Sequence, residues 1–156
     1  MTFKMKKISI GLVLSVYMLM PALGAETVRY CNNRFGQCAS VPALPAELHD
    51  SANGDGRTYV YANGLSIAIY SGYNVFGNDA KAHFNQFHKR EGEITYSVIK
   101  DDWYVESGYI GDKVFYHKVF VNKNTNSGFY IEYPRALKSN LDAVVNLVSK
   151  SFKPSN

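Results

Sequence analysis

The sequence predicts a single α+β domain in which two helices pack on an antiparallel sheet of six to eight strands. Short runs of alternating apolar and polar residues, separated by turns rich in Gly, Asn and Asp, recur from residue 28 to residue 133. Two other segments, 79–91 and 137–152, repeat their apolar residues with helical spacing. The chain has 156 residues, 46% hydrophobic and 14% aromatic, which suits one folded core and excludes a disordered protein.

Residues 1–25 have the layout of a Sec-type signal peptide. Three lysines among residues 4–7 precede the apolar stretch 8–20, which is too short for a membrane span of about 20 residues. Pro21 and the small residues up to Ala25 follow, so we expect cleavage near Ala25, a periplasmic location and no stable membrane insertion afterwards. An uncleaved anchor is the alternative. No Cys stands at the cleavage point, which argues against a lipoprotein.

The charge of the remaining chain is nearly balanced. The full sequence has a net charge of +4, but three of its 17 basic residues and none of its 13 acidic residues lie in the leader. Residues 26–156, which we expect to form the whole domain, therefore carry a net charge of +1. This gives no support to nucleic-acid binding.

The chain has two cysteines, Cys31 and Cys38. Export implies an oxidising compartment, so we expect a disulfide that closes a hairpin over residues 28–42. Such a short loop gains about 2–3 kcal/mol of stability in the chain-entropy model. The Cys-x-x-Cys spacing typical of a redox site is absent.

The middle of the chain predicts a hairpin followed by a helix. Residues 43–50 read as a loop with a short extended stretch, and strands are expected at 57–61 and 65–70, joined by an Asn-Gly turn. Residues 71–78 read as a loop. Asp79 is placed to cap a helix that runs to about residue 91 and ends at Gly92.

The second half predicts four more strands and a closing helix. The strands are expected at 93–99, 103–109, 113–122 and 129–133, with a loose turn at 124–128. In the first of them, Ile94, Tyr96 and Val98 are expected on one face. The closing helix shows one apolar stripe, and Ser139 with Asp142 resembles a capping box. The stripe consists of Leu137, Leu141, Val144, Val145, Val148 and Phe152.

The sequence contains no recognisable catalytic set, so we expect no enzyme, no cofactor and no metal site. His83 and His88 are five residues apart, which on a helix turns the two side chains away from each other. His49 and His117 lie elsewhere without metal-ligand spacing. The Gly-rich stretch at 53–56 fits neither a calcium loop nor a phosphate-binding loop and reads as a tight turn.

The aromatic surplus suggests a binding surface instead, because Tyr and Trp contribute much contact area at low entropy cost. A Tyr in a Gly- and Asn-rich loop, an aromatic pair after an acidic turn and the tip of the stapled hairpin are expected to be exposed. The predicted partner-binding residues are Arg34, Phe35, Tyr73, Asn74, Asp101, Asp102, Trp103 and Tyr104.

Several short stretches resemble a group of small exported proteobacterial proteins. The Cys-bracketed segment 30–38 carries most of the resemblance, followed by 53–57, 94–96, Trp103, 115–118, 132–134 and 151–152. The layout of a sheet meander, a Tyr-Pro pair and a closing helix is similar to the PsbP-like α/β sandwich, a fold used for protein binding. Periplasmic immunity proteins of type VI secretion effectors include members with this architecture.

The resemblance implies a periplasmic immunity protein that binds and inhibits a toxin acting on peptidoglycan. Acidic side chains at Asp101 and Asp102 would suit a basic toxin, because peptidoglycan is negatively charged. The alternative is a periplasmic envelope accessory or ligand-binding protein without catalytic activity.

Overall fold

The computed structural model describes residues 26–88 and 92–155. The predicted signal peptide lies outside these ranges, as do residues 89–91 of the predicted first helix. No helix within them is long and apolar enough to cross a membrane.

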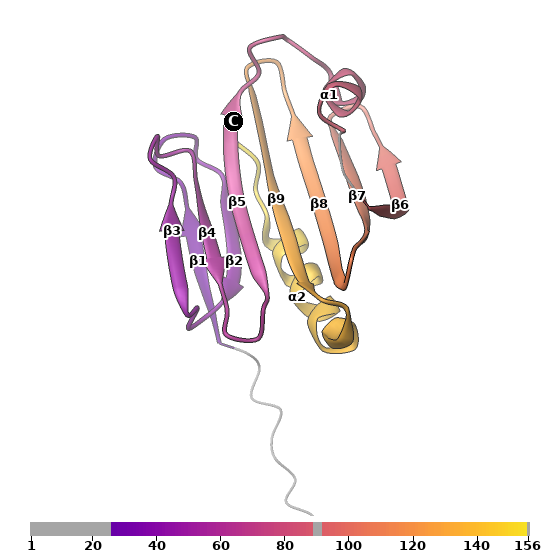
Figure 1. Cartoon of the computed structure of the whole chain (residues 1–156). Coiled ribbons are helices and arrows are strands. Elements are labelled where there is room, and N and C mark those ends of the chain that lie inside the picture. Colours follow the sequence, from indigo (N-terminus) through magenta and orange to yellow (C-terminus); the bar gives the residue numbers. More distant parts are fainter. Residues whose placement is uncertain (1–25, 89–91, 156) are drawn as a thin grey trace, which may run out of the picture.

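The described residues form two antiparallel sheets and two α-helices, whose arrangement can be followed in Figure 1. A two-stranded sheet pairs β1 with β2, and a seven-stranded sheet has the order β3-β4-β5-β9-β8-β7-β6. This arrangement confirms the predicted α+β class. The elements are β1 (Thr27–Cys31), β2 (Cys38–Pro42), β3 (Glu47–Asp50), β4 (Gly56–Val60), β5 (Ser66–Tyr73), α1 (Ala80–Phe87), β6 (Glu93–Ile99), β7 (Trp103–Ile110), β8 (Lys113–Val121), β9 (Thr125–Pro134), a 3-10 turn (Arg135–Leu137) and α2 (Lys138–Ser151).

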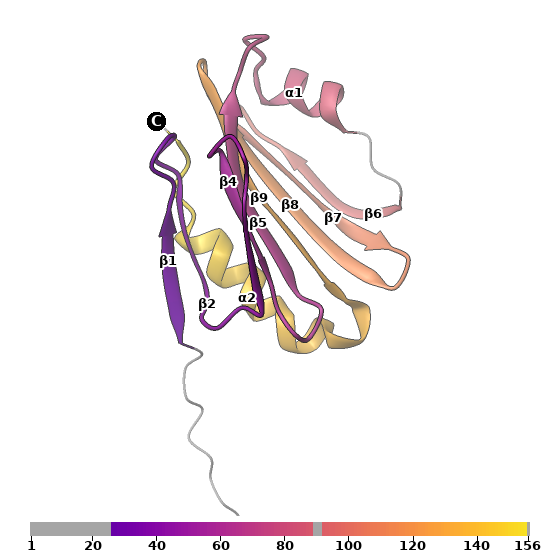
Figure 2. The same ribbon diagram turned by 60° about the vertical axis from the view of Figure 1, so that its left-hand side comes forward.

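The elements form three layers, which Figure 2 shows from the side. The β1–β2 hairpin and α2 cover one face of the large sheet, while α1 lies on the opposite face against β6, β7 and β8. The main core fills the space between the sheet and the layer of α2 and the hairpin. Its buried side chains include Val41, Ile67, Ile69, Phe129, Ile131, Tyr133 and Val148.

The apolar stripe of α2 packs on this core as expected. Leu141, Val148 and Phe152 are buried in the core. The other three members of the stripe, Leu137, Val144 and Val145, are partly buried and pack against the edge of that core. The predicted capping box is wrong, because the helix begins at Lys138 without a side-chain cap. Asp142 instead accepts hydrogen bonds from the Tyr133 hydroxyl (2.7 Å) and Lys138 Nζ (2.6 Å), so its carboxylate joins the helix to β9.

Two segments that were expected to be loops are the polar ends of β5 and β9. Residues 71–73 and 125–127 pair with each other in the middle of the sheet. Gly128 is required there: a Cβ at this position would lie 2.5 Å from the Lys118 carbonyl oxygen and 3.0 Å from the Tyr70 hydroxyl. The turn itself is shorter than predicted and is held by Asn122 Oδ1, which accepts hydrogen bonds from the backbone of Asn124 and Thr125.

A bulge in β6 overturns the predicted face of that strand. Ile94 pairs with Gly108, but after a register shift Tyr96 pairs with Ser107 and Val98 with Val105. Ile94 therefore lies on the face opposite to Tyr96 and Val98. Gly108 makes this possible, since a Cβ there would come within 1.8 Å of the Glu93 carbonyl oxygen.

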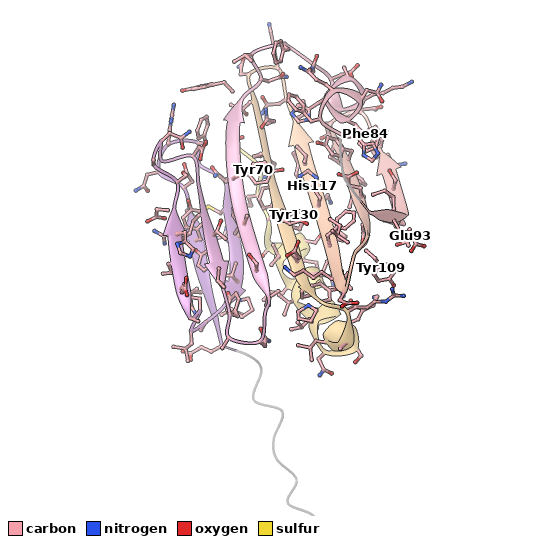
Figure 3. The ribbon with its side chains drawn as sticks, in the orientation of Figure 1. Tyr70, Phe84, Glu93, Tyr109, His117 and Tyr130 are labelled. Carbon is pink, nitrogen blue, oxygen red and sulfur yellow. A yellow bond between two sulfur atoms is a disulfide. The ribbon has the colours of Figure 1, made fainter. Side chains whose placement is uncertain are left out.

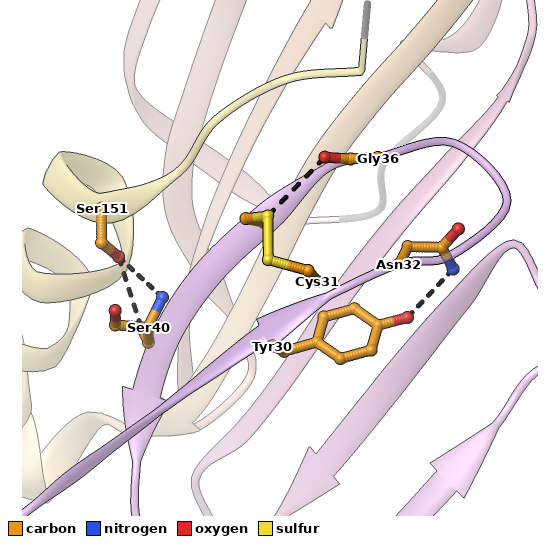
Figure 4. The surroundings of a disulfide bond; sticks show 7 residues. Tyr30, Cys31, Asn32, Gly36, Ser40 and Ser151 are labelled. Atoms are coloured by element: carbon orange, nitrogen blue, oxygen red, sulfur yellow. Dashed lines mark hydrogen bonds between the residues drawn. A yellow bond between two sulfur atoms is a disulfide. The ribbon is translucent and has the colours of Figure 1, made fainter.

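The N-terminal hairpin is closed by the predicted disulfide between Cys31 and Cys38 (Figure 4). The C-terminal part of the chain fastens the hairpin to the rest of the domain. Ser151 Oγ accepts a hydrogen bond from the Ser40 amide, and residues 38 and 153 exchange two backbone hydrogen bonds of 2.8 and 3.0 Å.

Candidate functional site

Three of the predicted binding residues meet at the tip of the hairpin. The rings of Phe35 and Tyr73 lie edge to face with their centroids 5.1 Å apart, and the Arg34 guanidinium stands 5.0 and 5.6 Å from the two centroids. The tip is rigid because Asn32 Oδ1 accepts hydrogen bonds from the Arg34 and Phe35 amides. Arg34 is also fixed from outside the hairpin, since its Nη1 donates to the Asn53 carbonyl oxygen at 2.5 Å.

The loop after Tyr73 extends this surface. Tyr73, Val75 and Phe76 are 60%, 76% and 66% exposed, which is unusual for three large apolar side chains within four residues. Asn74, by contrast, is buried, contrary to the expected contact role. Its amide nitrogen donates to the carbonyl oxygens of Asn78 and Asn122 at 2.8 Å, so Asn74 holds the loop in place.

We call Arg34, Phe35, Tyr73, Val75 and Phe76 the tip surface. The β1–β2 turn and the loop between β5 and α1 that carry these residues lie at the upper end of the molecule in Figure 1. The sequence predicted Arg34, Phe35 and Tyr73 as binding residues but not Val75 and Phe76. Both lie in the segment 71–78, which was predicted to be a loop, and large apolar residues in a loop could have indicated an exposed surface.

The acidic turn between β6 and β7 lies at the same end of the sheet (Figure 1), with Asp101 and Asp102 exposed. Trp103 is half-buried, with Lys118 Nζ 4.4 Å from its ring centroid. Burial lowers the pKa of Lys118, and the nearby Asp102 opposes this shift. Tyr104 is only 2% exposed, so its expected role as an exposed contact is wrong. Its side chain lies under α1, packed against Phe84.

A buried carboxylate on β7 organises a second, unexpected site. Glu106 is 1% exposed, with Oε2 2.5 Å from His88 Nδ1 and Oε1 3.2 Å from His117 Nδ1. His117 Nε2 lies 2.5 Å from the Tyr70 hydroxyl. When the carboxylate is ionised and His117 is neutral, Nδ1 donates a hydrogen bond to Glu106 and Nε2 accepts a hydrogen bond from the Tyr70 hydroxyl. We call these four side chains the Glu106 network.

The network forms part of a cavity of about 410 Å³ on the face that carries α1. Figure 3 shows Tyr70, His117 and Tyr130 on neighbouring strands, on the same side of the sheet. Their rings are close: the His117 centroid is 6.1 Å from that of Tyr70 and 5.9 Å from that of Tyr130. Tyr70 reaches His117 across β9 because Gly128 leaves room for its ring.

His83 of α1 completes the wall of this cavity. Its Nδ1 lies 3.2 Å from the Tyr104 hydroxyl, and its ring packs on Phe87 at a centroid distance of 4.5 Å. Burial lowers the pKa of His83, and the nearby His117 lowers it further, so the His83 imidazole is neutral at neutral pH.

One pair of the Glu106 network, Glu106 and His117, can be predicted from the sequence through the turn that joins β7 to β8. The two-residue turn at Gly111 and Asp112 fixes the register of β7 and β8, which places Glu106 directly opposite His117. His88 comes from a distant helix end and could not be added to the pair from sequence. Within residues 26–88 and 92–155, no group of three or more His, Cys, Asp or Glu side chains is arranged to hold a metal ion.

No model of a known protein family matches the chain. No curated protein is similar to it in sequence. Among the solved structures, it is similar to the solution structure of cyanobacterial PsbP (CyanoP) from Synechocystis sp. PCC 6803, with a TM-score of 0.62 and 13% identity. The match covers 85% of this chain and 95% of CyanoP. With its seven-stranded antiparallel sheet and two flanking helices, the chain therefore has the PsbP-like fold.

Proposed function

We propose that this protein is a periplasmic immunity protein that binds and inhibits a cell-wall-targeting toxin of the type VI secretion class. The observation that carries the proposal is the tip surface, where large apolar side chains stand exposed on a rigid support. A few exposed aromatic and Arg side chains can supply most of the affinity of a protein–protein interface.

The tip surface is preorganised, so it is expected to bind a partner with higher affinity than a flexible loop of the same composition would. The disulfide, the Asn32 hydrogen bonds and the Asn74 hydrogen bonds hold its two supporting segments. Little conformational entropy is then lost when a partner covers Tyr73 or Phe76.

The acidic turn adds a charged rim to the same end of the sheet. Asp101 and Asp102 are exposed, and opposite charge on a partner would speed association and fix its orientation. A toxin that acts on negatively charged peptidoglycan is expected to present basic side chains near its cleft.

A second candidate function is that of a periplasmic accessory protein that binds a small ligand and has no toxin partner. The cavity of about 410 Å³ beside the Glu106 network favours it, because aromatic walls with a few polar groups are typical of small-molecule sites.

The first test is co-expression in the periplasm with the product of the neighbouring gene, compared with that product alone. Protection from lysis and a complex on size-exclusion chromatography are the expected results. Equal lysis in both cultures, with no complex, would exclude immunity against that product and favour the accessory function.

Point variants then test the tip surface in that complex. Tyr73→Ala and the double change of Asp101 and Asp102 to Lys are each expected to weaken binding at least tenfold, or about 1.4 kcal/mol. Tyr96→Ala is the matched control, because Tyr96 is 53% exposed but lies on β6, outside the tip surface. Both sets should melt within a few degrees of the wild type. An unchanged Kd for Tyr73→Ala would contradict the role of the tip surface.

A further inference from the structure

A groove runs between the stapled hairpin and the edge of the large sheet. Residues of β1, of the segment after β2, of β3 and of β4 line a cavity of about 760 Å³. Arg34 of the tip surface is among the lining residues, so the groove continues from the tip surface along the side of the molecule. Figure 2 shows the hairpin and the large sheet as separate layers on this side.

The groove has an apolar lining that the chain itself leaves partly uncovered. Tyr30 and Tyr59 meet edge to face across it at a centroid distance of 6.2 Å. Around them, Val28, Leu48 and Leu44 are 44%, 53% and 88% exposed. Leu44 also has a backbone φ of 58°, a conformation that costs a Leu about 1–2 kcal/mol. The fold thus holds this side chain at the rim of the groove at an energetic cost.

Both strands that border the groove are sheet edges. Among residues 26–88 and 92–155, β1 pairs only with β2, and β3 pairs only with β4. The Asn32 amide donates to the Gln37 carbonyl oxygen, and the Ala43 amide donates to the Glu26 carbonyl oxygen. These two bonds show which residues of β1 direct their backbone groups toward β2 and which direct them away. Because the direction alternates along a strand, the backbone N–H and C=O groups of Thr27 and Arg29 point away from β2.

The same argument applies to β3. The Ser51 amide donates to the Gly56 carbonyl oxygen, so the backbone groups of Leu48 and Asp50 point away from β4. The groove is therefore bordered by two rows of backbone donors and acceptors at open sheet edges. An extended chain can pair with such an edge, whereas a lipid tail or a small ligand leaves its donors and acceptors unmatched.

The positive charge of the groove lining favours an acidic occupant. Three arginines, Arg29, Arg34 and Arg57, line the groove with a single carboxylate, Asp50. Arg57 Nε and Nη2 donate to that carboxylate at 2.5 and 2.9 Å, which leaves two positive charges in excess. The whole chain after the leader has a net charge of only +1, so the groove is the more basic part.

We propose that this groove binds an extended acidic segment of a partner protein, which adds as a strand to an open edge while its alternate apolar side chains enter the groove. The proposal deepens the proposed function and rests on it in so far as the segment belongs to the toxin. Acidic side chains of the segment pair with Arg29 and Arg34. Val28, Leu48 and the partly buried Tyr30, which packs on the buried Tyr59, receive its apolar side chains.

The test uses a fluorescein-labelled hexapeptide of alternating Glu and Val, titrated with the protein purified from periplasm and followed by fluorescence anisotropy. Two matched peptides serve as controls: one with Lys in place of Glu, and one with N-methyl groups on alternate backbone nitrogens. The acidic peptide is expected to bind at least tenfold more tightly than either control, and more weakly as salt is raised.

Protein variants locate the binding. Arg29→Glu is expected to weaken the acidic peptide at least tenfold, and Thr27→Pro, which removes an outward N–H without touching the β1–β2 ladder, should also weaken it. Arg135→Glu is the control, because Arg135 is exposed and stacks on Tyr109, away from the groove. Unchanged melting temperatures show that the variants are folded.

Three results would overturn the proposal: equal affinity for the acidic and basic peptides, equal affinity for the N-methylated peptide, or an Arg29→Glu variant that binds as the wild type does. Binding to anionic lipid vesicles with no peptide binding would also overturn it. The peptide test needs no toxin, so specific peptide binding together with failed protection would support the groove and reject immunity against the toxin tried.

Discussion

Glu106 is a buried carboxylate on β7 that pairs with histidines from two other elements. An isolated buried carboxylate costs several kcal/mol, but each of its oxygens here meets an imidazole Nδ1, one from the end of α1 and one from β8. Tyr70 of β5 then bonds to His117. The Glu106 network thus links α1 to three strands, β5, β7 and β8.

His83 makes acid stability a test of how α1 is packed. Burial lowers its pKa, so the unfolded chain binds a proton near pH 6.5 more readily than the folded chain does. Stability from this group is complete above about pH 6.5 and is lost as the pH falls toward the lowered pKa. We expect His83→Gln to lose less stability than the wild type between pH 7.5 and pH 5.5.

Urea unfolding at the two pH values measures this difference. The other three histidines are the same in both proteins, so the difference between the variant and the wild type reports on His83. His49→Gln is the control, since His49 is exposed on β3. An identical pH dependence in His83→Gln and the wild type would show that His83 is not buried between α1 and the sheet as described.

At the scale of elements, apolar alternation predicted β6, β7 and β8 almost to the residue, but predicted β5 and β9 only as far as their apolar halves. The pairs Ser71–Ser127 and Gly72–Asn126 continue the β5–β9 ladder with polar and small residues. No hydrophobic signal marks them, so they read as loops. They form strand because the neighbouring strands supply backbone partners and because Gly128 lets the Tyr70 ring cross β9.

The packing of α2 can be tested with one buried and one exposed position. Val145 packs against the core at its margin, so Val145→Asp places an unpaired carboxylate beside apolar side chains and is expected to cost several kcal/mol. Ala143→Asp is the matched control, because Ala143 is exposed on the same helix and should change stability by less than about 0.5 kcal/mol. Thermal melting distinguishes the two, and equal melting temperatures would mean that the stripe is not packed.

For the whole molecule, the sequence was sufficient to predict the α+β class, the stapled hairpin and the helix that closes the core. Periodicity and turn residues are local signals, and these features depend on them. Three other features join segments that lie far apart in the chain. They are the packing of α1 over Tyr104, the contact between Phe35 and Tyr73, and the groove beside Leu48. No local pattern specifies such contacts, so the sequence predicted Tyr104 as exposed.

The C-terminal tail gives a prediction at the same scale. Lys153 pairs with Cys38 through its backbone, while Ser155 bonds to the buried side chains of Thr125 and Ser127. Deleting residues 153–156 removes these hydrogen bonds, so we expect the free energy of unfolding to fall by about 2–4 kcal/mol in urea unfolding. Lys153→Ala keeps the backbone and should change stability little. A deletion variant as stable as the wild type would show that the tail does not fasten the hairpin.

The bridge between residues 38 and 153 also sets an order on folding. The chain is synthesised from its N-terminus, and the hairpin with its disulfide is local enough to form early. Its docking must wait until Lys153 is available, because Lys153 provides the backbone partner of Cys38. A prematurely terminated chain would therefore keep an oxidised but undocked hairpin and expose unpaired strand edges, which are targets for proteases and sites of aggregation.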